Sequence, residues 1–111
     1  VEGKRIVLVD DSIVRGTTSK KIVQMMKKVG GAKEVHMRIS SPPVKYSCFY
    51  GVDTPDEDVL IANRMSLAGI AELIGADSLG FISNEGLRKT PVGAKCGFCS
   101  ACFDGNYPLE V

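Results

Sequence analysis

The sequence predicts an α/β fold, with a parallel sheet, flanking helices and an irregular, cysteine-containing C-terminal segment. The apolar run at residues 6–9 is typical of a strand buried on both faces of a parallel sheet. Residues 17–29 repeat apolar side chains at helical spacing, and residues 35–39 alternate apolar and polar side chains. A strand, a helix and a second strand in this order predict a right-handed crossover between parallel strands.

The helix expected at residues 17–29 presents one apolar stripe and an opposite face rich in lysine. The stripe consists of Ile22, Val23, Met25, Met26 and Val29. We expect both methionines in the core, and the glycine pair at 30–31 should end the helix, because glycine adopts the left-handed conformation there. His36, the only histidine, falls on the polar face of the next strand and is interpreted as a surface or interface residue rather than a catalytic one.

The remaining elements are shorter. Residues 41–54 read as an irregular packed loop, and Thr54 can cap a helix that starts at Pro55 and runs to about Asn63. A helix at 67–74 ended by Gly75, a strand at 78–83 and a helical turn at 84–89 follow. We therefore divide the chain into two parts. Residues 1–89 form the C-terminal portion of a larger domain, and residues 90–111 form an irregular cysteine-bearing tail packed on it.

Composition narrows the class of protein. The 111 residues are 44% hydrophobic and 24% charged, without an apolar run of transmembrane length or a secretory signal, so we expect a cytoplasmic protein and no membrane partner. Residues 1–47 hold ten basic and four acidic side chains, which indicates a solvated basic face or a surface that steers anions. Because no aromatic residue lies among those bases before Tyr46, we expect no nucleic-acid partner. A first residue other than Met suggests a piece of a longer protein.

The stretch VLVDDSIVRGTTS, residues 7–19, has the chemistry of a sugar-phosphate site. Asp10 and Asp11 follow the first strand, at the edge where open α/β sheets bind ligands. Gly16 and the three hydroxyls after it lead into a helix N-terminus, which suits a phosphate monoester. The two carboxylates suit the ribose hydroxyls beside that phosphate, or Mg²⁺. The alternative is that the acids and hydroxyls only cap a turn and a helix.

Four cysteines, Cys48, Cys96, Cys99 and Cys102, lie in a chain with no export signal, which argues against a disulfide framework. The last three form a C-x₂-C-x₂-C pattern. The open choices are buried free thiols, zinc or an iron–sulfur cluster.

The segment IVLVDDSIVRGTTS resembles the phosphoribosyl-pyrophosphate loop of type I phosphoribosyltransferases, most closely that of the glutamine amidophosphoribosyltransferases. The resemblance continues through GAKEVHMRISSPPVKYSCFYGVDTP, ELIGADSLGFIS and CSACFDGNYPLE, in order along the chain. It implies that Asp10 and Asp11 contact the ribose hydroxyls and Mg²⁺. It further implies a substrate-binding loop for the 5-phosphate made of Ser12, Ile13, Val14, Arg15, Gly16, Thr17 and Thr18.

The resemblance also implies an activity. Such enzymes replace the pyrophosphate of phosphoribosyl pyrophosphate with glutamine-derived ammonia, giving 5-phosphoribosylamine in the first step of purine synthesis. They are feedback-inhibited by purine nucleotides, and the parent is expected to be a homo-oligomer. A glutaminase domain, the pyrophosphate loop and a flexible lid are not in these 111 residues, so we expect the fragment alone to be inactive.

One branch of the family carries a [4Fe–4S] cluster that holds the C-terminal segment and takes no part in the chemistry. The resemblance assigns three of its ligands to Cys48, Cys99 and Cys102, with the fourth upstream of this chain. Cys96 lies outside that pattern, and the alternative is that it takes the place of the missing ligand in the isolated fragment. Tyr46, Phe49 and Tyr50, the aromatic residues around Cys48, are expected to shield the cluster or join the core.

Two other classes of protein remain as alternatives. KRIVLVDDS also resembles the start of response-regulator receiver domains, in which Asp53 would be the phosphoacceptor closing a later strand. The two prolines before Asp53 are unfavourable for a central strand. The second alternative is a metal-stapled, non-catalytic domain in which Asp10 and Asp11 form only a turn.

Overall fold

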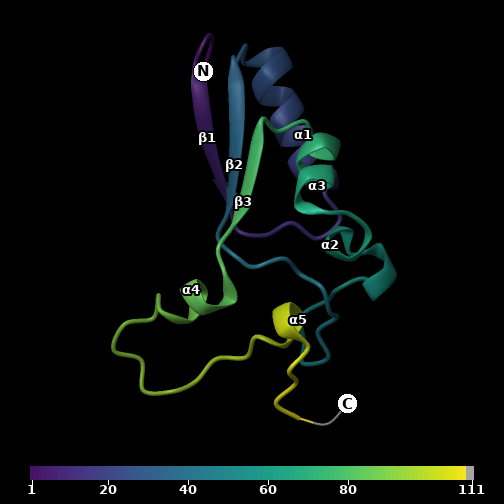
Figure 1. The fold of residues 1–111 in the computed structure, drawn as a ribbon, viewed down its shortest axis with the longest axis vertical. Helices are drawn as coiled ribbons and strands as arrows, with labels where there is room; N and C mark the ends of the chain where they lie inside the picture. Colours follow the sequence, from purple (N-terminus) through teal and green to yellow (C-terminus); the bar gives the residue numbers. More distant parts are fainter. Residues whose placement is uncertain (110–111) are drawn as a thin grey trace.

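A computed structural model describes residues 1–109 and confirms the α/β class, with a three-stranded parallel sheet in the order β1-β2-β3 (Figure 1). The strands are β1 (Arg5–Asp10), β2 (Glu34–Ile39) and β3 (Ser78–Phe81). The α-helices are α1 (Thr17–Gln24), α2 (Ile61–Arg64), α3 (Leu67–Ile74), α4 (Asn84–Arg88) and α5 (Ala101–Asp104). A π-helical turn, η1 (Met25–Val29), extends α1, and a 3₁₀ turn, η2 (Glu57–Val59), precedes α2.

The parallel register brings the carboxyl ends of the strands to one edge of the sheet. Asp10 pairs with Ile39, which in turn pairs with Phe81. The Ser40 N–H donates to the Asp10 carbonyl at 2.9 Å, directly beyond the last pair. The loop from β1 to α1 therefore leaves the sheet at the edge where ligands of open α/β sheets bind.

Helices α1 and α3 cover one face of the sheet and enclose the core (Figure 1). Val23 on α1, Val35 and Met37 on β2, and Ile74 on α3 have no measurable exposure. Burying side chains of this size supplies most of the stability of a small α/β unit.

The opposite face of the sheet is open within residues 1–109. Val7 is 65% exposed and Val9 is 70% exposed, so the expectation that this strand is buried on both faces is wrong for the described residues. The reason is that the helices lie on the other face and β1 is an edge strand. His36 also lies on the open face, half-buried and hydrogen-bonded to Ser78 Oγ at 2.7 Å and to Glu34 at 3.0 Å.

The apolar stripe of the first helix is shorter than predicted. Met25 is 57% exposed and Val29 is 83% exposed, whereas Met26 packs against the core. The Gly30 N–H donates to the Met25 carbonyl, an i→i+5 bond that marks the wider π-helical turn. This turn changes the angle between successive side chains and takes Met25 and Val29 off the buried stripe.

The predicted helix from Pro55 to Asn63 is wrong. A 3₁₀ turn follows Asp56 instead, and Leu60, with ψ of 118°, is extended and separates that turn from α2. Thr54 does not cap a helix, because its hydroxyl accepts the Cys48 N–H at 2.9 Å.

Helix α3 has the predicted bounds, with the Ser66 hydroxyl accepting the Gly69 N–H at its start and Gly75, at φ of 80°, ending it. Strand β3 ends two residues before the predicted Ser83, because the Ser83 hydroxyl accepts the Gly86 N–H and caps α4.

Residues 90–99 form an irregular stretch, as predicted, and residues 91–99 are all exposed. The short helix α5 inside the tail was not predicted. The last two residues of the predicted tail, 110 and 111, lie outside the described residues. Within the described part of the chain, no helix combines the length and apolar character needed to cross a membrane.

Candidate functional site

A cavity of about 660 Å³ lies beyond the carboxyl end of β1, lined by two separate stretches of chain. The first stretch is residues 10–19, which contains every residue predicted to bind the phosphoribosyl group, together with Ser19. The second stretch, residues 53–55, comes from the loop after β2. Figure 1 shows the first stretch running from the end of β1 under the sheet to α1.

The two acids at the end of β1 each keep one carboxylate oxygen out of local hydrogen bonds among residues 1–109. Asp10 Oδ1 accepts the Asp11 N–H at 2.8 Å, and Asp11 Oδ1 accepts the Ser12 hydroxyl at 3.2 Å. These bonds fix the carboxylates at the mouth of the cavity, Asp10 half-buried and Asp11 exposed. Their remaining oxygens can accept hydroxyl protons or coordinate a hard cation.

The N-terminus of α1 forms the anion-binding part of the cavity. The first helical bond runs from the Lys20 N–H to the Gly16 carbonyl at 3.0 Å. Among the described residues, the amides of Thr17, Thr18 and Ser19 have no backbone or side-chain acceptor, and the first turn contains no acidic side chain. Free amides and the helix dipole both favour a negative charge at this point.

Glycine is favoured at position 16 by the backbone conformation, and a side chain there would also displace the end of Ile61. The φ of Gly16 is 84°, in the left-handed region that favours glycine, and a Cβ there would lie 2.9 Å from Ile61 Cδ1. The loop before Gly16 is held in place, because Ile13 is 2% exposed in the core and the Val14 carbonyl accepts the Ile61 N–H at 2.9 Å. The cavity therefore has a rigid floor.

The second wall, Asp53, Thr54 and Pro55, was not predicted as part of this site. The only signal in the sequence was the polar turn GVDTP, whose distance from residues 10–19 along the chain hid its proximity. The receiver alternative required Asp53 at the end of a strand. Asp53 is exposed and lies in a loop instead. That alternative therefore has no support.

The thiols lie in a second region, away from the sheet. Cys48 and Cys102 are half-buried, Cys96 and Cys99 are exposed, and all four are free. The segments of Cys48 and Cys102 are joined, since the N–H groups of Lys45 and Tyr46 donate to the Cys102 carbonyl at 2.9 and 3.1 Å.

The two half-buried thiols have opposite electrostatic environments. The N–H groups of Tyr50 and Val52 lower the pKa of Cys48, and the Tyr50 N–H lies 3.4 Å from the sulfur. Burial raises the pKa of Cys102, and the neighbouring Cys48 and Cys99 raise it further. The charges of Cys48 and Cys99 thus act on Cys102.

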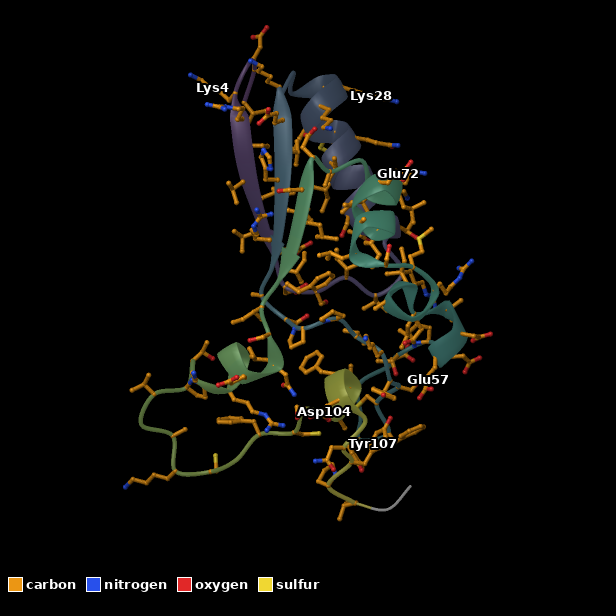
Figure 2. All side chains as sticks on the ribbon, viewed as in Figure 1. Lys4, Lys28, Glu57, Glu72, Asp104 and Tyr107 are labelled. Atoms are coloured by element: carbon orange, nitrogen blue, oxygen red, sulfur yellow. The ribbon has the colours of Figure 1, made fainter. Side chains whose placement is uncertain are left out.

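Polar contacts hold the tail around these thiols. Asp104 Oδ2 accepts bonds from Ser100 at 2.7 Å, Asn84 at 3.0 Å and Arg88 at 3.1 Å, which ties α5 to α4. The Tyr107 hydroxyl donates to the Ser47 carbonyl at 2.7 Å. Figure 2 labels Asp104 and Tyr107 on this C-terminal part of the chain.

The residues fit the two implied inorganic groups to different degrees. Mg²⁺ commonly takes only one or two protein carboxylates and completes its shell with substrate oxygens and water, which Asp10 and Asp11 can satisfy. An iron–sulfur cluster needs four thiolates. Within residues 1–109, no three metal-ligating side chains are grouped closely enough to hold a metal ion, so the thiols as they lie here do not form such a site.

The fold, with a cavity at the carboxyl end of its parallel sheet, is that of part of a type I phosphoribosyltransferase domain. A solved glutamine phosphoribosylpyrophosphate amidotransferase from B. subtilis, complexed with ADP and GMP, superposes with a TM-score of 0.86 at 54% identity. The match covers 99% of this chain and 25% of that one.

Proteins with similar sequences belong to the same family of enzymes as this solved structure. The chain is 57% identical over 110 residues to amidophosphoribosyltransferase 1, chloroplastic, of Arabidopsis thaliana, covering 99% of this chain and 19% of that protein. It is 55% identical over 116 residues to the Bacillus subtilis amidophosphoribosyltransferase, covering 100% of this chain and 24% of that protein. No family model matches the chain. Over its whole length the chain is homologous to a C-terminal segment of amidophosphoribosyltransferases, and it spans about a fifth to a quarter of their length.

Proposed function

We propose that this chain is the part of an amidophosphoribosyltransferase that binds the ribose 5-phosphate end of phosphoribosyl pyrophosphate. The whole enzyme would replace pyrophosphate with glutamine-derived ammonia and form 5-phosphoribosylamine, the first step of de novo purine synthesis. The cavity that joins two carboxylates to a helix N-terminus carries this proposal. The identity of 50% or more to proteins with that name supports it.

Each part of the cavity has a role in this reaction. The amides of residues 17–19 and the hydroxyls of Thr17 and Thr18 would hold the 5-phosphate, while Ser12–Arg15 shape the loop around it. Asp10 and Asp11 would accept bonds from the ribose hydroxyls. Their negative charge would also stabilise the positive charge that develops on the ring as the pyrophosphate leaves. Mg²⁺, when bound, would neutralise charge on the leaving pyrophosphate.

Purine nucleotides are proposed to regulate the whole enzyme, in keeping with the B. subtilis protein solved with ADP and GMP. A nucleoside monophosphate carries the same ribose 5-phosphate unit as the substrate, so the anion-binding part of this cavity suits it equally well. The parent protein is proposed to be a cytoplasmic homo-oligomer, although plant relatives are named chloroplastic.

A [4Fe–4S] cluster is proposed for the parent protein, with Cys48, Cys99 and Cys102 as three ligands and the fourth outside this chain. The backbone bonds that join the segments of Cys48 and Cys102 support the proposal. Cys96 is left outside the ligand set. Anaerobic iron and sulfide analysis of the full-length protein tests it, with loss of iron expected for Cys102→Ser and retention expected for Cys96→Ser.

The test of the proposed function is the Asp11→Asn substitution in the full-length enzyme, assayed with ammonia as nitrogen donor. We expect kcat/KM for phosphoribosyl pyrophosphate to fall about 100-fold or more, because an amide cannot provide the charge. Asp58→Asn, an exposed acid of η2 that does not line the cavity, is the matched control. Unchanged kinetics in Asp11→Asn contradict the proposal.

The isolated 111-residue chain is proposed to be inactive, since no pyrophosphate-binding loop has been identified in it. Formation of phosphoribosylamine by the purified chain would refute this.

A further inference from the structure

The loop that carries Cys48 also forms the second wall of the cavity. The Cys48 N–H donates to Thr54 Oγ1 at 2.9 Å, and the Ser47 hydroxyl donates to the Pro55 carbonyl at 3.1 Å. These two bonds close residues 47–55 into a ring. One side of the ring, residues 53–55, lines the cavity, and the other side carries the thiol.

The same ring is tied to the tail by different bonds. The Ser47 carbonyl accepts the Tyr107 hydroxyl at 2.7 Å, and the Tyr50 hydroxyl donates to the Leu109 carbonyl at 2.8 Å. The neighbouring Tyr46 N–H donates to the Cys102 carbonyl. Hydrogen bonds and the short backbone segments between them therefore connect the wall of the cavity to the Cys48 amide and to the Cys102 carbonyl.

We propose that Thr54 is a positioning residue that couples occupancy of the cavity to the order of the Cys48 segment. Thr54 is half-buried, lines the cavity and contributes the acceptor that holds the Cys48 amide. A ligand that fixes residues 53–55 makes opening of the Cys48–Thr54 bond rarer. By linkage, an ordered Cys48 segment in turn favours the ligand. This inference rests on the proposed function, in that phosphoribosyl pyrophosphate is taken as the ligand.

Hydrogen exchange of the full-length protein, followed by mass spectrometry of its peptides, tests the coupling. Magnesium and phosphoribosyl pyrophosphate should slow exchange at residues 46–52, none of which lines the cavity, by about fivefold, the lower end of typical coupling between sites. Thr54→Val should abolish this protection and raise the KM for phosphoribosyl pyrophosphate while kcat is retained. Thr54→Ser, which keeps the hydroxyl, should restore both.

Thr90→Val is the matched control, because the Thr90 hydroxyl donates to the Leu87 carbonyl and neither residue lines the cavity. It should leave the protection at residues 46–52 unchanged.

Peptides covering residues 10–19 report whether the ligand binds at all. Protection there without protection at 46–52 in the wild-type protein overturns the coupling and leaves the proposed function standing. Absence of protection at both segments overturns the proposed function, and the coupling with it. Equal protection at 46–52 in wild type and Thr54→Val shows that Thr54 is not the link.

Discussion

Two regions of this molecule are held together by different forces. The sheet region, residues 1–39 and 61–82, contains five of the six largest fully buried side chains, which are Met37, Ile70, Ile74, Val23 and Val35; the sixth, Leu60, lies outside the core cluster of the sheet. In the thiol region, residues 41–56 and 83–109, the buried apolar side chains Val44 and Ala101 are smaller, and individual polar contacts such as those of Asp104 and Tyr107 add to them. The cavity takes one wall from each region. The site therefore has one wall next to an apolar core and one wall in a loop held by hydrogen bonds.

Ile74→Ala should show the largest effect, because it removes a side chain with no exposure from the core of the sheet region. We expect the free energy of unfolding to fall by about 4 kcal/mol, within the usual range for large-to-small core substitutions. Urea unfolding of the full-length protein measures it. Leu73→Ala, at a neighbouring position that is 39% exposed, is the control and should have a much smaller effect. Similar losses in both variants would break the distinction between core and surface.

Gly16→Ala should have the next largest effect. The left-handed conformation and the close approach to Ile61 Cδ1 together should lower stability by about 3 kcal/mol. Binding of phosphoribosyl pyrophosphate should weaken as the turn shifts, as calorimetric titration would show. Gly93, in the thiol region, has φ of 79° and no atom within 4 Å of an added Cβ. Gly93→Ala therefore measures the cost of the left-handed backbone conformation without a steric contact. A Gly93→Ala effect as large as that of Gly16→Ala would show that packing at the cavity floor is unimportant.

Asp104→Asn tests the polar contacts of the thiol region, with an expected loss of about 1–2 kcal/mol. The Ser100 hydroxyl, then the Asn106 N–H, hold the pKa of Asp104 below its ordinary value. A carboxyl with a lowered folded pKa contributes stability that is present above its unfolded pKa of about 3.9 and is lost as pH falls through the folded value. Thermal unfolding between pH 7 and 2.5 should therefore show convergence of wild type and variant at acid pH. A constant difference across that range contradicts the charge-based account.

Glu85→Gln should have the smallest effect. The ion pair between Glu85 and Lys89 spans 3.3 Å, but the two side chains are 82% and 75% exposed. Pairs of this kind contribute less than about 0.5 kcal/mol, and salt screens them. A loss comparable to that of Asp104→Asn, measured by the same unfolding curves, would show that surface charge also stabilises the thiol region.

The sequence was informative where a repeating pattern determines structure. The spacing of apolar side chains located α1, β2 and α3, and the acids, Gly16 and hydroxyls located the first wall of the cavity. The exposure of Val7 and Val9 could not be read from an apolar run, since the run does not say which faces of the sheet are covered. The second wall was missed because it depends on the Cys48–Thr54 and Ser47–Pro55 bonds, which have no periodic signature.

The helix expected from Pro55 failed for the same reason. Thr54, a good capping residue in the sequence, uses its hydroxyl for a contact six residues back along the chain. Local propensity could not anticipate that competition between a cap and a loop-closing bond.

The edge position of β1 has a practical consequence for handling this chain by itself. Within residues 1–109, β1 pairs only with β2, so its outer edge presents unpaired backbone N–H and C=O groups beside the exposed Val7 and Val9. Such an edge pairs readily with the same edge of another copy. At the concentrations used for purification or spectroscopy, the isolated chain should self-associate through strand addition. A charged residue in place of Val7 should keep it monodisperse.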